Sequence, residues 1–205
     1  MVVLQGSLGS EKCIKQEDDY LYQKNISEHD LVNISADGKL EKKYVFRNVQ
    51  EEDAQEIIEI EQICFPPHEA CSPKNMTERV QEASDSFMVL EDVENKNIVG
   101  FINGIATNEE KFRDEFFTDI STHNCSGVNV MITGVDVRPE YEKRGIAGLM
   151  MLEYQFRSKK KGRKKLVLTN LDRLTPFYER MGFVDLGIAE SNWGGEEWHE
   201  MELQL

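Results

Sequence analysis

Residues 135–148 give the strongest indication of the fold and read Val135-Asp136-Val137-Arg138-Pro139-Glu140-Tyr141-Glu142-Lys143-Arg144-Gly145-Ile146-Ala147-Gly148. Its first part predicts the end of a strand over 128–137, because Pro139 cannot continue a hydrogen-bonded ladder. Its last part predicts a helix over 145–157 that opens with small residues. A strand therefore passes through a short loop directly into a helix.

The start of this helix has the properties of an anion site. The first N–H groups of a helix have no internal partners, and the aligned peptide dipoles make that end positive. Small residues at 145, 147 and 148 would let a diphosphate approach the backbone, and Lys143 and Arg144 add positive charge. The alternative is an ordinary strand–loop–helix connection with a tight helix–sheet contact, and a Gly-x-Ala-Gly segment alone does not exclude it.

Hydrophobic patterning and turn residues predict the elements on either side. Ser72 and Pro73 are a helix start, as N-cap and first helical residue. The predicted strands cover 44–48, 86–91, 98–107, 128–137, 166–169, 183–188 and 198–203, and the predicted helices cover 52–64, 73–83, 145–157 and 174–181. This order predicts an α/β (α+β) fold with a mixed sheet rather than a doubly wound parallel one.

Two segments fall outside these elements. Residues 108–127 are polar and acidic, with a helical turn expected around Phe116 and Phe117, and this length is unusual for a loop joining two strands. Residues 1–43 form an N-terminal extension ahead of a domain over 44–205. An added hairpin, partial disorder and a flexible linker at residues 6–10 all stay open for this extension.

Composition limits the class of protein. Hydrophobic residues make up 40% of the 205 residues, which fits a globular chain. No apolar run approaches the roughly 20 residues that cross a bilayer, and residues 1–10 do not resemble a signal peptide, so we expect a cytoplasmic protein with no membrane partner. The four cysteines form no CxxC pair and no Cys/His ligand spacing, so we expect reduced thiols and no metal.

The net charge is −14, and residues 44–137 carry 6 basic and 19 acidic side chains. Such a field repels nucleic acid and attracts small cations such as protonated amines, although a charge that only favours solubility is the alternative. The basic residues clustered over 157–165 surround a predicted helix end. They are typical of a solvated C-terminus that compensates the helix dipole, and we expect no nucleic-acid partner.

Residues 142–147 resemble the acetyl-CoA-binding motif of the GNAT (Gcn5-related N-acetyltransferase) superfamily, Arg/Gln-x-x-Gly-x-Gly/Ala. Glu142, Gly145 and Ala147 hold the matching positions, and Glu142 departs from the usual Arg or Gln. Residues 174–183, Leu-Thr-Pro-Phe-Tyr-Glu-Arg-Met-Gly-Phe, resemble a second family segment. The resemblance covers about residues 44–205 and is closest to arylalkylamine N-acetyltransferase-like members. It implies a GNAT fold, with a mixed central sheet of about six to seven strands and about four helices.

The resemblance implies that acetyl-CoA is the cosubstrate and assigns residues to it. The backbone of Val135 and Val137 would hold the pantetheine arm, with the Val135 N–H also donating to the oxyanion. The residues implied to bind the coenzyme are Val135, Val137, Lys143, Arg144, Gly145, Ile146, Ala147, Gly148, Asn170 and Phe177.

Acetyl transfer to an amine requires a neutral amine, a stabilised oxyanion and a proton for the leaving thiolate. By resemblance, Tyr178 is the general acid, and the alternative is a core aromatic. Two histidines form a water relay in vertebrate amine acetyltransferases, but Met131 and Thr133 stand at their positions. Insect dopamine acetyltransferases use a glutamate before their second helix. Glu69 holds the matching position, so the resemblance implies that it is the base or that it anchors the amine. The alternative is that Glu69 is a solvated carboxylate near a helix N-terminus.

Three functions follow from the resemblance. We expect an enzyme that acetylates a small primary amine. Acetylation of a protein N-terminus or lysine is the second hypothesis, against which the segment over 108–127 argues by narrowing access. A non-catalytic acyl-CoA-binding domain is the third, and a homodimer is an open alternative to a monomer.

Overall fold

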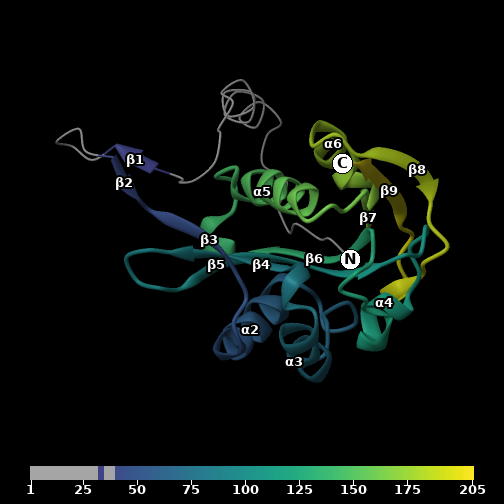
Figure 1. Ribbon diagram of the computed structural model, residues 1–205, viewed down its shortest axis with the longest axis horizontal. Coiled ribbons are helices and arrows are strands. Elements are labelled where there is room, and N and C mark those ends of the chain that lie inside the picture. Colours follow the sequence, from purple (N-terminus) through teal and green to yellow (C-terminus); the bar gives the residue numbers. More distant parts are fainter. Residues whose placement is uncertain (1–31, 35–39) are drawn as a thin grey trace.

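The computed structural model describes residues 32–34 and 40–205, and a seven-stranded sheet lies at its centre (Figure 1). The sheet has the order β3-β4-β5-β6-β7-β9-β8. Its strands are β3 (Tyr44–Asn48), β4 (Phe87–Asp92), β5 (Ile98–Thr107), β6 (Asn129–Val137), β7 (Lys165–Asn170), β8 (Val184–Ile188) and β9 (His199–Gln204). All neighbours are antiparallel except β6 and β7, which are parallel. The predicted mixed sheet is confirmed.

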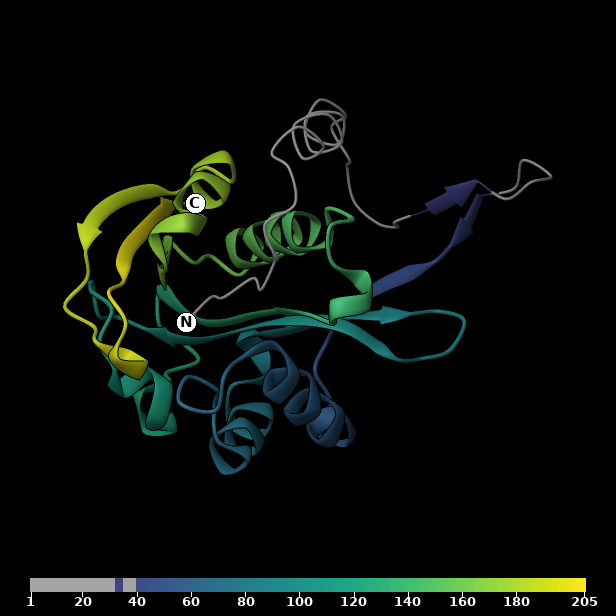
Figure 2. The same cartoon turned by 180° about the vertical axis from the view of Figure 1, so that it is seen from behind.

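Helices cover both faces of this sheet. On one face lie α2 (Ala54–Cys64) and α3 (Pro73–Glu82), and on the other lie α5 (Ile146–Lys160) and α6 (Thr175–Arg180) (Figures 1 and 2). The segment before β6 contains the short helix α4 (Glu115–Thr118). The described residues thus form five α-helices where about four were expected, and the additional one is the predicted turn around Phe116 and Phe117.

Each face of the sheet has its own hydrophobic core. On the α2 side, Ile57, Ile60 and Met76 are fully buried against β5 and β6. On the α5 side, Met150 and Met151 are equally buried. Helix α3 begins as predicted, because the Ser72 hydroxyl accepts the Asn75 N–H at 3.2 Å and Pro73 is its first residue.

The N-terminal part of the chain is described only over two short strands. β1 (Val32–Ile34) and β2 (Leu40–Lys42) pair antiparallel in a separate two-stranded sheet. The rest of the predicted extension, residues 1–31 and 35–39, lies outside the described residues. Cys64, Cys71 and Cys125 are free thiols, whereas Cys13 lies in the part not described. None of the helices in the described part is long and apolar enough to span a membrane.

Candidate active site

The site begins where β6 and β7 separate. Their parallel pairing covers only Asn129–Ile132 against Lys165–Leu168. β6 continues to Val137, and over this second half it is paired with β5 alone. Backbone groups of β6 that face β7 beyond Ile132 therefore have no ladder partner in the described sheet, and they can bind an extended ligand as an added strand would.

A β-bulge at Thr133 controls which way the end of β6 faces. Asn103 of β5 pairs with Gly134 and Gly104 pairs with Ile132, so Thr133 is the extra residue. An extra residue reverses the alternation of side chains beyond it. Val135 and Val137 therefore join the α5-side core, and Asp136 faces α2.

The loop after β6 leads into an α5 N-terminus without a side-chain cap. Gly145 is the N-cap at φ 72°, and no side chain accepts a hydrogen bond from the first turn. Lys143 also has a positive φ of 59°, and its side chain and that of Arg144 are exposed. These features fit a diphosphate, because the unpaired N–H groups and two cations meet at one point. The neighbouring Glu142 carboxyl does not fit a diphosphate, because its charge would repel one. Partial burial raises the pKa of this carboxyl, and the charge of Lys143 opposes that rise.

The other predicted coenzyme residues surround the same point. Ile146 is buried and Ala147 half-buried in the first turn of α5. A Cβ built on Gly148 would lie 4.0 Å from the Phe177 ring, so this turn packs against α6. Asn170, at the end of β7, is fully buried, and its Nδ2 donates to the Thr175 hydroxyl at 3.0 Å. Its Oδ1 has no partner in the described structure and can accept a hydrogen bond from a ligand.

Tyr178 lies on α6 and belongs to the α5-side core. Its ring packs edge-on against Phe177 and Phe183, with centroids 4.9 and 5.7 Å away. Its hydroxyl is fully buried and has no hydrogen-bond partner among the described residues. Burial, and then the charge of Asp136, hold the pKa of this phenol well above its usual value. The ring is thus a core aromatic, while the hydroxyl keeps its proton and is free to donate it.

Glu69 lies in the loop between α2 and α3, beneath the loop that precedes β9. The Trp193 indole N–H donates to the Glu69 carbonyl at 3.0 Å, and the Trp193 ring lies 5.0 Å from that of Phe117. The Glu69 carboxyl is buried, which raises its pKa, and one of its oxygens has no partner in the described structure. Three loops therefore meet over Glu69, and the predicted alternative of a solvated carboxylate is wrong.

The positions of the family histidines face α2, on the opposite side of the sheet from α5. Met131 is fully buried in the α2-side core, and the Thr133 hydroxyl donates to Asn103 Oδ1 at 2.5 Å. His123 lies elsewhere, since its Nδ1 accepts the Ala106 N–H at 3.2 Å and its Nε2 is 3.0 Å from Asp85. His68 is exposed and lies 3.4 Å from Glu69.

The sequence did not point to a buried polar cluster beneath the bulge. Asp136 and Asn103 are 1% exposed, and Glu61 and Arg79 are 4% exposed. Arg79 donates to Asn103 Oδ1 at 3.0 Å and to the Phe117 carbonyl at 2.8 Å. One signal was available, because Asp136 is an acidic residue between two valines inside a buried strand.

One group in the described part of the chain could hold a metal ion. Ligand atoms of His68, Glu69 and Glu196 lie within 4.8 Å of one another. Two of the three are exposed, and exposed acidic groups commonly lie together without an ion. We assign no metal to them.

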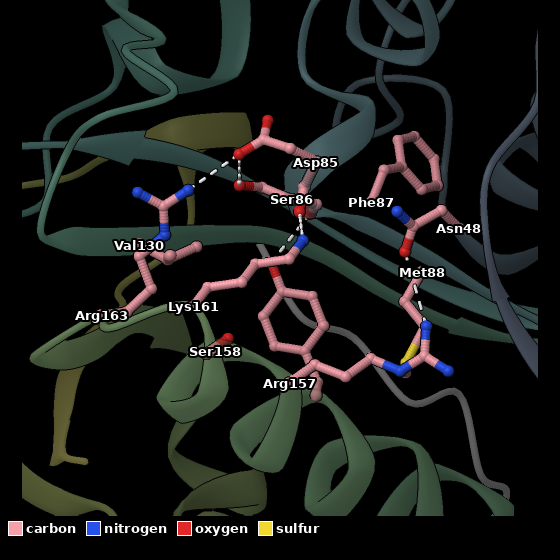
Figure 3. A pocket seen from close by; sticks show the side chains of 11 residues that line it. Asn48, Asp85, Ser86, Phe87, Met88, Val130, Arg157, Ser158, Lys161 and Arg163 are labelled. Carbon is pink, nitrogen blue, oxygen red and sulfur yellow. Dashed lines mark hydrogen bonds and ion pairs between the residues drawn. The ribbon is translucent and has the colours of Figure 1, made fainter.

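The cavity of Figure 3 is not this site. It lies beside the C-terminal part of α5 and has a volume of about 10 Å³, which suits one water. At its edge, Lys161 donates to the Asp85 carbonyl and Arg163 pairs with the Asp85 carboxylate, whereas Lys165 bridges Glu110 and Glu202. Part of the predicted solvated basic cluster therefore forms ion pairs, because the acidic loops fold onto it.

A splayed parallel strand pair, beside an uncapped helix N-terminus and a buried tyrosine hydroxyl, defines the class of acyl-coenzyme A-dependent acyltransferases. Residues 54–183 match the acetyltransferase (GNAT) family. Since this match covers more than half of the chain, the chain belongs to that family, and its membership supports acyl-CoA-dependent N-acetyltransferase activity in general.

Solved structures show the same fold. The loading GNATL domain of CurA from Lyngbya majuscula has a TM-score of 0.67 at 17% identity, over 78% of this chain and 97% of that chain. The PaiA N-acetyltransferase of Thermoplasma acidophilum, in complex with coenzyme A, has a TM-score of 0.57 at 16% identity, over 79% and 99%. The ribosomal-protein-S18-alanine N-acetyltransferase from Escherichia coli has a TM-score of 0.55 at 17% identity, over 78% and 93%.

Among curated proteins, YhcX of Bacillus subtilis (strain 168), which carries the name of a hydrolase, is 27% identical over 115 residues, or 53% of this chain. The chain spans only 22% of the length of that relative.

Proposed function

We propose that this protein transfers the acetyl group of acetyl-CoA to the primary amine of a small molecule, by direct attack, with Tyr178 as general acid. One observation carries the proposal. The Tyr178 hydroxyl is fully buried, has no partner among the described residues, and keeps its proton because its pKa is well above neutral. A proton donor at this position can neutralise the leaving thiolate.

The coenzyme site supports this role. The unpaired edge of β6 at Val135 and Val137 offers backbone hydrogen bonds to an extended arm, and the first turn of α5 offers N–H groups to a diphosphate. Acetyl-CoA supplies the activated acetyl group when it is bound there. Asn170 Oδ1 is a further acceptor.

The acceptor side supports a small substrate. The loop with Glu69, the segment with Phe117 and the loop with Trp193 meet over the α2 side of β6. Glu69 is our candidate for base or amine anchor, since a buried carboxylate attracts an ammonium group. The acidic middle of the chain favours cationic substrates, and we propose a cytoplasmic protein without nucleic-acid or membrane partners.

A thiol-release assay tests the proposal, with acetyl-CoA and separate panels of arylalkylamines, polyamines, amino acids and aminoglycosides. We expect thiol release with a small amine and first test arylalkylamines, to which the sequence resemblance points. Turnover confined to peptides would favour protein acetylation instead. Calorimetric binding of acetyl-CoA without thiol release from any amine or peptide would indicate a non-catalytic domain.

A further inference from the structure

Two buried carboxyl groups, of Asp136 and Glu61, face each other on the acceptor side of β6. Neither Asp136 oxygen has a hydrogen-bond donor in the described structure. Glu61 Oε1 accepts the Cys71 N–H at 2.7 Å, whereas its Oε2 has none. A buried carboxylate without donors is costly, so a structure that keeps one has another use for it.

The surrounding charges do not balance this pair. The groups that face it are the Cys64 thiol from α2, the Arg79 guanidinium from α3 and the Tyr178 hydroxyl from α6. Arg79 is the cation among them, and its hydrogen bonds go to Asn103 and to the carbonyls of residues 116 and 117. Burial and the charge of Glu61 raise the pKa of Asp136 well above its usual value. The pair therefore holds one negative charge easily and a second only with a cation beside it.

The pair lies where the strands separate. A Cβ built on Gly134 would be 3.2 Å from Asp136 Oδ2 and only 2.5 Å from Asn103 Nδ2, so glycine lets the Asn103 amide and the Asp136 carboxyl pack closely beside the bulge. Asn103 Nδ2 is also a buried group without a partner in the described structure. The charge of Asp136 also acts on Tyr178, so this carboxyl lies near the proposed acid.

We propose that Asp136, paired with Glu61, is the general base that takes the proton from the ammonium group of the acceptor, an assignment that rests on the proposed function. The ammonium gives one proton to the pair, and the neutral amine forms the C–N bond. The C–S bond breaks as Tyr178 gives its proton to the thiolate, and the second proton of the nitrogen passes to the Tyr178 phenolate, which restores the acid. The proton held by the carboxyl pair is then released to solvent. The reaction yields amide, thiol and one released proton.

This assignment separates the roles of two buried carboxyl groups. The charged groups around Glu69 are His68, Arg173 and Glu196, and none of them contacts Tyr178. Glu69 then anchors the amine under the loop that contains Trp193, while Asp136 receives the proton of the ammonium group.

The variant D136N tests the assignment, because asparagine keeps the shape and removes the ionisable group. We expect kcat/KM at neutral pH to fall by about 100-fold or more, and the limb of the pH profile that rises with pH to disappear, while acetyl-CoA affinity stays within about twofold. E61Q keeps the oxygen that accepts from Cys71 and removes a negative neighbour, so the rising limb should move to lower pH. D92N is the matched control, since Asp92 is buried in the β4–β5 turn, where it accepts the Glu94 N–H.

Stability gives a readout independent of activity. Because the folded pKa of Asp136 is raised, its contribution to the free energy of unfolding is full below the unfolded pKa of about 3.9 and is lost as pH rises through the folded pKa. D136N should therefore be at least as stable as the wild type at neutral pH and less pH-dependent above about pH 4.

The outcomes separate the two claims. An active wild type whose D136N variant keeps its rate and its pH profile overturns the base while the proposed function stands. A wild type inactive on every amine overturns both, even if the stability of D136N behaves as expected.

Discussion

Tyr178 uses different atoms for packing and for the proposed chemistry. Its ring fills the α5-side core between Phe177 and Phe183, and its hydroxyl stays without a partner in the described structure. A core tyrosine kept only for packing would lose nothing as phenylalanine and would gain from losing an unsatisfied polar group. The hydroxyl therefore calls for a functional explanation.

Tyr178→Phe keeps the ring and removes the proton donor. We expect kcat to fall by about 100-fold or more, because general acid catalysis contributes at least that much, with little change in acetyl-CoA affinity. Steady-state kinetics and calorimetry measure the two quantities, and Tyr154→Phe is a control whose lost hydroxyl bonds the Ser86 carbonyl instead. A Tyr178→Phe enzyme with wild-type kcat would contradict the assignment.

Glu142 departs from the family motif, and its charge has a measurable effect. Its carboxyl precedes the N-terminus of α5, where a bound diphosphate would be repelled by it. Glu142→Gln should therefore tighten acetyl-CoA binding by about threefold at low ionic strength, with the gain shrinking as salt is added. Glu153→Gln is a suitable control, since it lies in the middle of α5 and pairs with Arg157. Weaker binding by Glu142→Gln would show that the carboxyl assists the site.

At the element scale, the N-terminus of α5 depends on a backbone that only glycine adopts easily. Gly145 has a φ of 72°, and a branched side chain there would be strained and would project towards the proposed diphosphate. Gly145→Val should abolish detectable acetyl-CoA binding by calorimetry. Gly162→Val is the matched control, because Gly162 has a φ of 76° beyond the other end of α5 with nothing within 4 Å of its Cβ position. Equal loss in both variants would show that strain in the fold, rather than the site, is responsible.

The strand and helix that carry the coenzyme site could be predicted from the sequence, but the direction in which Asp136 faces could not. Most of the predicted coenzyme residues are close in sequence, over 135–148, and local patterns predict the strand end and the helix start that carry them. Val130 and Ile132 face α5, so regular alternation would put Asp136 there too. The bulge at Thr133 turns Asp136 towards α2 instead.

The pairing of the Asp136 and Glu61 carboxyl groups could not be predicted from the sequence either. The bulge is set by pairing with β5, and the Glu61 partner is contributed by α2, so both depend on contacts between distant segments. Element boundaries were predicted within a few residues, because caps, prolines and turn residues are local signals.

At the scale of the whole molecule, the acceptor side is closed by segments that lie far apart in sequence. Trp193 stacks on Phe117, donates to the Glu69 carbonyl, and accepts at its own carbonyl from the indole of Trp198. One side chain thus connects the loop after α2, the segment before β6 and the loop before β9. Access for a substrate depends on these three loops together.

Trp193→Ala should open this side without disturbing the coenzyme site. We expect KM for a small amine to rise about tenfold, because Glu69 loses the loop that fixes it, while acetyl-CoA affinity is unchanged. Larger amines and short peptides should become better substrates relative to the wild type, since the cover that limits their size is gone. Phe156→Ala, a partly exposed aromatic on α5, is the control for removing a large side chain. If Trp193→Ala kept the wild-type KM and substrate size limit, the three loops would not enclose the acceptor, and the small-molecule assignment would lose its structural basis.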